Sequence, residues 1–211
     1  MLYIKKLVSI LSVSILMIMA ASACQKQNDE MMSEDKMSKD TTDMTDMVEV
    51  TSALAVLEPT EGSNVSGVVY FKTMEGGIEV TADIKGLKPG KHGFHIHQFG
   101  DLRADDGTSA GGHFNPMDMK HGAPGDSVRH VGDLGNIEVS NDGTAHYERV
   151  DSLISFSGKN SILGRAIVVH VGEDDLKSQP TGDAGARAAV GIIGIANDDY
   201  SAKMDTMKTA K

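Results

Sequence analysis

Short stretches of alternating apolar and polar residues fill most of the chain after residue 47, and Gly, Pro, Asn and Asp separate them. The clearest alternation is at residues 78–84, where Ile, Val, Ala and Ile occupy every second position. This period is typical of a half-buried β-strand, because successive side chains point to opposite faces of a sheet. The pattern predicts eight strands, at residues 48–57, 67–74, 78–84, 92–98, 134–140, 144–150, 161–171 and 189–196.

Turn residues between these stretches favour antiparallel connections. Glu75-Gly76-Gly77 and Asn141-Asp142-Gly143 each separate two predicted strands, and short loops that contain glycine are typical of β-hairpins. The same region has no stretch with the 3.6-residue apolar period of a helix. We therefore expect one all-β domain, an eight-stranded antiparallel Greek-key sandwich or barrel with two long functional loops.

The first 23 residues have the features of a signal peptide. Lys5 and Lys6 precede an apolar run at residues 7–20, which is shorter than the roughly 20 residues that a membrane-spanning helix needs. Small residues then precede Cys24, the only cysteine of the chain. This order resembles the signal of bacterial lipoproteins and predicts a lipidated Cys24 that anchors the protein to a membrane, facing the periplasm or the exterior. The alternative is plain secretion with a free thiol.

Residues 25–47 combine five methionines with charged, amide and hydroxyl residues, and they include no aromatic or aliphatic side chain. Such a segment cannot bury enough apolar surface to fold by itself, so we expect a flexible tether. Thioether sulfur suits Cu(I), and copper collection is the alternative to a plain linker. The predicted organisation is a signal peptide at 1–23, a tether at 24–47, the β domain at 48–198 and a flexible tail at 199–211.

The chain is acidic, with 20 basic and 30 acidic residues and a formal net charge of −10. Removal of the signal peptide would leave 18 basic residues and a charge of −12, because Lys5 and Lys6 would be lost. This charge argues against nucleic acid as a partner. A single cysteine also means that an exported form has no intrachain disulfide, which is unusual for a small exported domain.

Histidines are concentrated in one segment, residues 95–133, which holds five of the eight in the chain. In Phe94-His95-Ile96-His97 the strand period places the two imidazoles on one face, although an isolated H-x-H pair is more often an exposed edge strand. Further potential ligands follow at separations of 8, 9 and 3 residues, and these are His113, His121, His130 and Asp133. Turns in this Gly-rich segment can gather three nitrogens and one oxygen into the tetrahedral set that zinc prefers.

Several ordered motifs resemble the copper/zinc superoxide dismutases, over about residues 53–196. They are HGFHIHQFGD, SAGGHFNP, RHVGDLGN, SGKNSILGRAIVVH and TGDAGARAAVGIIGIA. The resemblance implies a copper site of four histidines, which are His95, His97, His113 and His170. It also implies a zinc site formed by His113, His121, His130 and Asp133. His113 would then be shared by both metals, and the implied reaction converts superoxide to dioxygen and hydrogen peroxide, with His113 supplying a proton.

The resemblance assigns two further side chains. Arg187 matches the arginine that docks superoxide beside copper, and Asp174 matches a carboxylate that accepts N–H bonds from one ligand of each metal, here His95 and His121. The loop that contains them is shorter than in many eukaryotic members. Pro180 stands where those members often carry a guiding lysine, so steering of the anion is expected to be weaker unless Lys177 substitutes.

The resemblance also implies a homodimer, formed through segments that match residues 99–100, 163–164 and 192–196. The family's usual disulfide would join positions that correspond to Gly107 and Val190, which cannot form it. We expect zinc to compensate for the missing bond. His92 is expected to be a structural hydrogen-bonding residue, and His146 to face solvent.

Two other functions use the same ligands. A copper and zinc buffer, or a copper donor fed by the tether, would bind both metals without turnover, but such a protein has no use for an arginine at the copper site. A relative without redox activity would be expected to lack copper ligands, and none is missing from this sequence.

Overall fold

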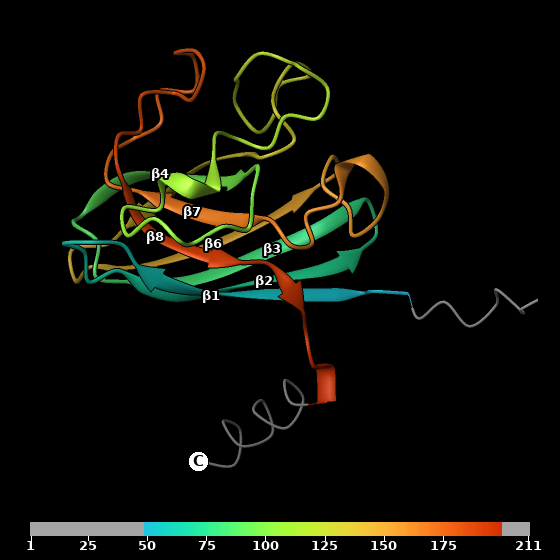
Figure 1. Cartoon of the computed structure of the whole chain (residues 1–211), viewed down its shortest axis with the longest axis horizontal. Helices are drawn as coiled ribbons and strands as arrows, with labels where there is room; N and C mark the ends of the chain where they lie inside the picture. Colours follow the sequence, from blue (N-terminus) through green and yellow to red (C-terminus); the bar gives the residue numbers. More distant parts are fainter. Residues whose placement is uncertain (1–48, 200–211) are drawn as a thin grey trace, which may run out of the picture. The chain divides into compact units, whose positions relative to one another are not determined.

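The structure, a computed structural model, describes residues 49–199, and these residues form a β-barrel (Figure 1). The strands are β1 (Ser52–Pro59), β2 (Ser66–Met74), β3 (Gly77–Lys85), β4 (Gly90–His97), β5 (Asp133–Val139), β6 (Thr144–Asp151), β7 (Ala166–His170), β8 (Arg187–Ile192) and β9 (Gly194–Ile195). Neighbouring strands follow the order β5-β4-β7-β8-β1-β2-β3-β6, and the two-residue β9 pairs with β1. The predicted all-β fold with eight main antiparallel strands is confirmed.

Alternating burial along the strands produces a single main core inside the barrel. In β3 every second residue is buried, from Ile78 through Val80 and Ala82 to Ile84, as the sequence alternation predicts. The largest of the fully buried apolar side chains are Phe71, Phe94, Leu57, Ile96, Leu134, Ile137, Ile162, Ile167 and Ile193. Each such side chain contributes about 1.5–3 kcal/mol to folding, so the barrel is a stiff support for whatever its strands carry.

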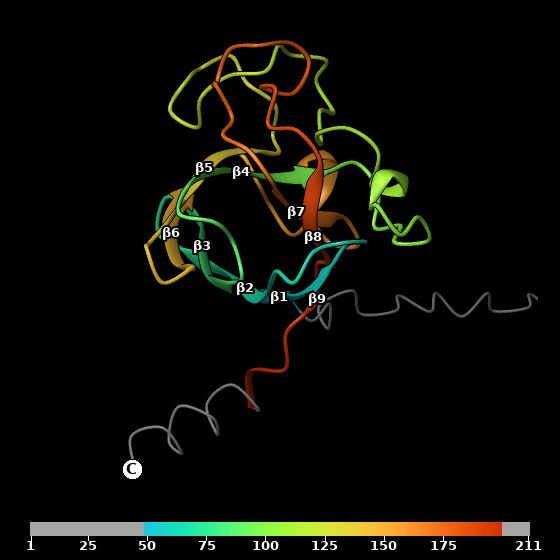
Figure 2. The same cartoon turned by 90° about the vertical axis from the view of Figure 1, so that its left-hand side faces the viewer.

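The sheet does not close by backbone pairing, because β5 and β6 stand at the two ends of the strand order. Figure 2 shows these two strands next to each other on the wall of the barrel. Tyr147 of β6 bridges the gap, since its hydroxyl donates to the carbonyl of Leu134 on β5 at 2.8 Å. Its ring also packs edge-on against Phe94 in the core, with centroids 5.1 Å apart. The side chain of Tyr147 therefore connects β5 and β6, where backbone pairing does not close the barrel.

Two predicted strands differ from the structure in more than small shifts of their ends. The stretch at 161–171 is a strand only from Ala166, because Gly164 has a φ of 74° and Arg165 donates its backbone N–H to Ile162 in a turn. The stretch at 189–196 is divided into β8 and β9. Between them the N–H of Ile193 donates to the carbonyl of Arg165, and its carbonyl accepts from Gly164, so Ile193 belongs to neither strand and β9 then pairs with β1.

Two loops meet on one side of the barrel, where residues 113–132 of the first lie beside the second (Figures 1 and 2). The long loop (residues 98–132) joins β4 to β5, and the short loop (residues 171–186) joins β7 to β8. The end of the long loop is attached to β6 by a buried ion pair between Arg129 and Asp151, 2.6 Å long. The same guanidinium donates to the carbonyls of His130 and Asp133. Within residues 49–199, no helix is long and apolar enough to cross a membrane.

Candidate metal centre

The two histidines of the H-x-H sequence lie on the outer face of β4, opposite the core residues Phe94 and Ile96. β4 pairs with both β5 and β7, so it is not the exposed edge strand that such a sequence by itself favours. His95 is 0% exposed and His97 2% exposed, because the short loop contacts the first and the long loop contacts the second. The strands hold both imidazoles, and the loops remove them from solvent.

One cluster, the four-histidine group, lies where β4 and β7 meet the loops. Its members, whose ligand atoms all lie within 4.8 Å of one another, are His95, His97, His113 and His170. Nδ1 of His95 and Nε2 of His113 are buried and have no hydrogen-bond partner in the structure. Nε2 of His97 and Nε2 of His170 are 3.3 Å apart. Four imidazole nitrogens therefore converge on one point, which is a donor set suited to copper.

The second nitrogen of each strand histidine is fixed by a separate acceptor. Nε2 of His95 lies 2.7 Å from Oδ2 of Asp174. Nδ1 of His97 lies 2.8 Å from the carbonyl of Gly111, and Nδ1 of His170 lies 2.9 Å from the carbonyl of Gly185. These bonds set the tautomer of each ring and direct its other nitrogen toward the cluster.

A second cluster, the mixed group, adjoins the first and contains His113, His121, His130 and Asp133. Oδ1 of Asp133 lies 2.8 Å from Nδ1 of His113, 3.0 Å from Nδ1 of His121 and 3.2 Å from Nδ1 of His130. Zinc–ligand bonds of about 2.0–2.1 Å in a tetrahedron place ligand atoms about 3.3 Å apart. The spacing of these atoms, and the buried Nδ1 atoms of His121 and His130 that lack a hydrogen bond, fit a zinc ion.

His113 is the one residue that belongs to both groups within the described part of the chain. Its Nδ1 faces Asp133 in the mixed group, and its Nε2 is free in the four-histidine group. The ring centroid is 4.0 Å from that of His95. A β-bridge between His113 and His97, and a hydrogen bond from the backbone N–H of Phe114 to the carbonyl of Ile96, hold this part of the loop against β4. One imidazole can therefore contact two metal ions at once.

Asp174, on the short loop, connects the two groups. Its Oδ2 accepts from His95 and its Oδ1 lies 2.9 Å from Nε2 of His121, and the carboxylate is fully buried. Gly182 makes this approach possible, because a Cβ at that position would lie 1.8 Å from Oδ1 of Asp174. Asp174 therefore contacts one histidine of the four-histidine group and one of the mixed group.

Burial and the two carboxylates give the histidines different pKa values. Burial, together with the neighbouring His113, lowers the pKa of His95 to about 3, and burial lowers that of His170 to about 4. For His121 burial also lowers the pKa, but the adjacent carboxylates of Asp133 and Asp174 outweigh it and raise the pKa to about 9. The mixed group therefore attracts positive charge, and the four-histidine group offers neutral imidazoles. Metal binding requires neutral imidazoles, so the four-histidine group already has the required protonation state, whereas His121 must lose its proton when a metal binds.

Arg187 begins β8 beside the four-histidine group, opposite His170 in the sheet register. Its guanidinium donates to the carbonyls of Gly107 and Gly111, and Gly111 is also the residue whose carbonyl contacts His97. The side chain is half-buried. A cation is therefore held at a fixed position next to the cluster.

The remaining residues singled out in the sequence have simpler surroundings. His92 lies between the carbonyls of His170 and Lys88, each 2.9 Å from one ring nitrogen, which is the structural role expected of it. His146 is exposed and pairs with Asp83 at 2.7 Å. Gly107 and Val190 are neighbours, since a Cβ on Gly107 would lie 2.8 Å from Val190. Cys24, with the predicted signal peptide and tether, lies outside the described residues.

Sequence comparison identifies the family. Residues 65–193 match the family model described as copper/zinc superoxide dismutase (SODC). This chain belongs to that family. The "Superoxide dismutase [Cu-Zn]" of Onchocerca volvulus is 51% identical over 156 residues, which are 69% of this chain and 96% of the relative. The "Extracellular superoxide dismutase [Cu-Zn]" of Brugia pahangi is 46% identical over 153 residues, 68% of this chain and 76% of the relative.

Among solved structures, a crystal structure of the clock protein EA4 is similar, with a TM-score of 0.65 and 41% sequence identity. The match covers 70% of this chain and 97% of that one. Membership of the superoxide dismutase family confirms the enzyme class and the two metals, copper and zinc, that the sequence predicts. The four-histidine group and the mixed group supply donor sets that fit these two metals.

Proposed function

We propose that the protein converts superoxide to dioxygen and hydrogen peroxide, with copper held by the four-histidine group and zinc by the mixed group. The observation that carries this assignment is the position of His113, whose two ring nitrogens face different groups. A pair of unrelated metal sites would have no need of a shared imidazole. When bound, copper would supply the one-electron redox chemistry, and zinc, which has none, would fix the loop.

His113 would hold and release a proton at Nε2, the nitrogen that faces the four-histidine group. Its Nδ1, which faces Asp133, would stay bound in the mixed group, so the ring position would not change while the proton moves. Asp174 would keep His95 and His121 in the required tautomers. These roles follow from which nitrogen of each ring already has a fixed partner.

Arg187 would attract and orient the superoxide anion. Its position beside the four-histidine group is fixed by two backbone carbonyls, so the cation does not need to be ordered during each encounter. Local positive charge can raise association rates by roughly 10–10³-fold even on an acidic protein, and superoxide dismutase is itself a well-known case of this effect. Lys177, on the exposed surface of the short loop, is a further candidate for steering.

The decisive experiment measures metal content and superoxide decay on the same preparation. We expect one copper and one zinc per chain and a rate constant near the diffusional limit of roughly 10⁸–10⁹ M⁻¹s⁻¹, a range for which superoxide dismutase is itself a standard example. Cyanide is expected to inhibit. Full loading with both metals but no dismutation would contradict the proposal and favour the metal-buffer alternative.

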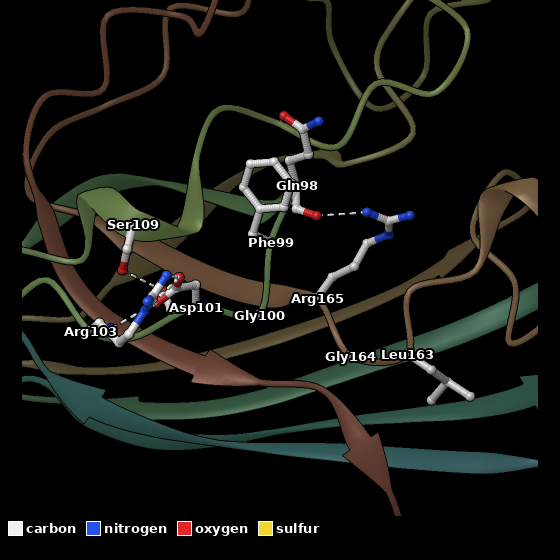
Figure 3. Close-up of a pocket in the computed structure, with 9 residues that line it drawn as sticks. All are labelled: Gln98, Phe99, Gly100, Asp101, Arg103, Ser109, Leu163, Gly164 and Arg165. Atoms are coloured by element: carbon white, nitrogen blue, oxygen red, sulfur yellow. Dashed lines mark hydrogen bonds and ion pairs between the residues drawn. The ribbon is translucent and has the colours of Figure 1, made fainter.

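We also propose a homodimer formed through the apolar surface around residues 99–100, 163–164 and 192–196. Phe99 is 51% exposed, Ile192 44% and Ile195 68%, although each is a large apolar side chain. Phe99, Leu163 and the backbone of Gly100 and Gly164 line a groove in this surface (Figure 3). Exposed apolar patches of this kind mark association sites. Sedimentation should give a dimer, and Ile195→Asp should give a monomer; a monomeric parent protein would refute this interface.

The finer prediction for location is that residues 1–23 are a signal peptide and that lipidated Cys24 anchors the domain through the tether at 24–47. Support comes from the order of basic, apolar and small residues before the only cysteine. One relative is named an extracellular enzyme, and an extracytoplasmic location is consistent with that name. Detergent phase separation tests the anchor: Cys24→Ser should no longer partition with membranes. Retention of the serine variant would implicate the apolar segment instead.

A further inference from the structure

The short loop is stabilised by its own polar contacts. The carboxylate of Asp175 accepts the backbone N–H of Lys177 at 2.9 Å and of Ser178 at 2.8 Å. Gly182 then donates its N–H to the carbonyl of Ser178 at 2.7 Å, and its own carbonyl accepts from Asp175. These bonds close residues 175–182 into a compact turn. Gln179, which lies in that turn, is therefore held in a defined position although its surface is exposed.

Gln179 reaches across to the long loop and makes a two-point contact with one residue, His121. Its Oε1 accepts the backbone N–H of His121 at 2.9 Å, and its Nε2 donates to the carbonyl of His121 at 2.9 Å. Nε2 also donates to the carbonyl of Lys177 at 3.0 Å, which fixes the amide orientation from the other side. A side-chain amide thus satisfies both backbone polar groups of His121, as a neighbouring strand would do in a sheet.

His121 needs this contact because its part of the long loop contains no strand. His113 is bridged to β4, His130 donates its N–H to Asp133, and Asp133 is the first residue of β5. His121 is 4% exposed, and a buried backbone N–H or carbonyl without a partner costs about 1–3 kcal/mol. Its backbone conformation therefore depends on a residue 58 positions away.

We propose that Gln179 is a positioning residue for the zinc site. Its amide fixes the backbone of His121 while Asp174, on the same loop, fixes the ring through Nε2. Together they aim Nδ1 of His121 at Asp133, 3.0 Å away. The short loop thereby controls how tightly the long loop retains its metal. This inference rests on the proposed role of His121 as a zinc ligand.

The test uses the full chain, stripped of metal and reloaded with zinc alone, with zinc release to a chromophoric chelator as the readout. Groups that orient a metal ligand typically change metal affinity by about 10–100-fold, so Gln179→Ala should release zinc at least about tenfold faster. Gln179→Glu keeps the volume and the acceptor for the N–H of His121, but it places a carboxylate oxygen against the carbonyl of His121. It should therefore lose zinc at least as fast as the alanine variant.

Asn141→Ala, on the exposed turn between β5 and β6, is the matched control for loss of a surface amide and should release zinc at the parental rate. A purely structural role for Gln179 would lower the melting temperatures of the metal-free and zinc-loaded forms equally, whereas we expect a larger decrease in the zinc-loaded form. Cobalt bound in place of zinc should show altered visible absorption in the two Gln179 variants.

The outcomes separate this inference from the proposed function. A parent protein that retains zinc tightly and a Gln179→Ala variant that retains it equally would overturn the role of Gln179 and leave the zinc site intact. Equal zinc retention in Gln179→Glu would do the same. A parent protein that fails to retain zinc would instead overturn the zinc assignment, and the inference with it.

Discussion

The two halves of the metal centre are held in different ways. Three members of the four-histidine group, His95, His97 and His170, lie on the paired strands β4 and β7. In the mixed group, only Asp133 belongs to a strand, and the three histidines lie on the long loop. Their positions depend on side-chain contacts from Asp174, Gln179 and Arg129.

The difference shows how one fold can combine a rigid site with an adjustable one. Moving a histidine of β4 or β7 requires breaking the pairing between strands and disturbing the core. The four-histidine group, here called the strand half, is therefore formed before any metal binds. Moving a histidine of the long loop requires breaking only a few polar contacts. The mixed group, here called the loop half, therefore gains more order from its metal. We therefore expect the proposed copper ligands to control turnover and the proposed zinc ligands to control stability.

The sharpest test of this division compares His97→Ala with His121→Ala, which remove one buried imidazole from each half. The first should abolish superoxide decay but leave zinc retention and the melting temperature of the zinc-loaded protein close to parental values. The second should release zinc and lower the melting temperature by roughly 10 °C, because a ligand at about 1,000 times its Kd contributes about 4 kcal/mol to stability. Equal effects of both variants on zinc retention would contradict the division.

Removing the metal and adding a reductant should have different effects on the melting temperature. Gly107 and Val190 occupy neighbouring positions without a disulfide, whose loss from a small secreted domain typically costs about 2–5 kcal/mol. If zinc compensates, a chelator should lower the melting temperature by several degrees or more, and dithiothreitol should leave it unchanged. Thermal scans with each reagent measure both effects. A metal-free form as stable as the zinc-loaded form would show that protein contacts alone replace the disulfide.

Asp174→Asn tests the one residue that contacts both halves. An amide keeps the shape, but it can accept a hydrogen bond at only one of its two positions, so the bond to His95 or the bond to His121 is lost. Zinc affinity should fall by about 10–100-fold, and copper affinity should fall less because β4 still holds His95. Competition titrations with each metal measure the two affinities. A larger loss of copper affinity than of zinc affinity would contradict the conclusion that the strand half is the more rigid of the two.

The sequence predicts candidate ligands for both halves, but it does not predict most of the contacts that hold the loop half in place. The alternation in β3 and in Phe94-His95-Ile96-His97 follows the strand period, so the burial of one face and the common side of the two histidines are local consequences of sequence. The candidate ligands are marked by their spacing and by the family motifs. The contact between Gln179 and His121 joins two irregular loops, and no periodicity marks either partner. The closing bond from Tyr147 to Leu134 also depends on tertiary structure.

A smaller effect is expected from Arg187→Ala, which removes a cation beside the strand half. The superoxide rate constant should fall by about tenfold or more, and its dependence on salt should flatten, because ionic strength screens the attraction that this charge provides. Zinc retention should not change. Lys72→Ala, on the exposed face of β2, removes the same charge elsewhere and is the control. An unchanged rate in Arg187→Ala would contradict the docking role.

The smallest effect concerns protons rather than metals and should be seen in the metal-free protein by NMR titration of the histidines. Burial lowers the pKa of His170 to about 4, so this ring should stay neutral through most of the acid range. Burial acts in the same direction on His121, but the adjacent carboxylates of Asp133 and Asp174 outweigh burial and raise the pKa to about 9. At pH 7 the strand half should therefore be neutral, and His121 should carry a proton.

The lowered pKa of His170 and the raised pKa of His121 have opposite consequences for stability. Because the unfolded state takes up protons near pH 6.5 and folded His170 does not, His170 should destabilise the metal-free protein as the pH falls from about 6.5 to about 4. His121 contributes stability below pH 6.5, and this contribution is lost as the pH rises through about 9. Zinc should remove the His121 titration, because the ion takes the position of that proton at Nδ1. If His121 still titrates near pH 9 in the zinc-loaded protein, Nδ1 of His121 is not a zinc ligand.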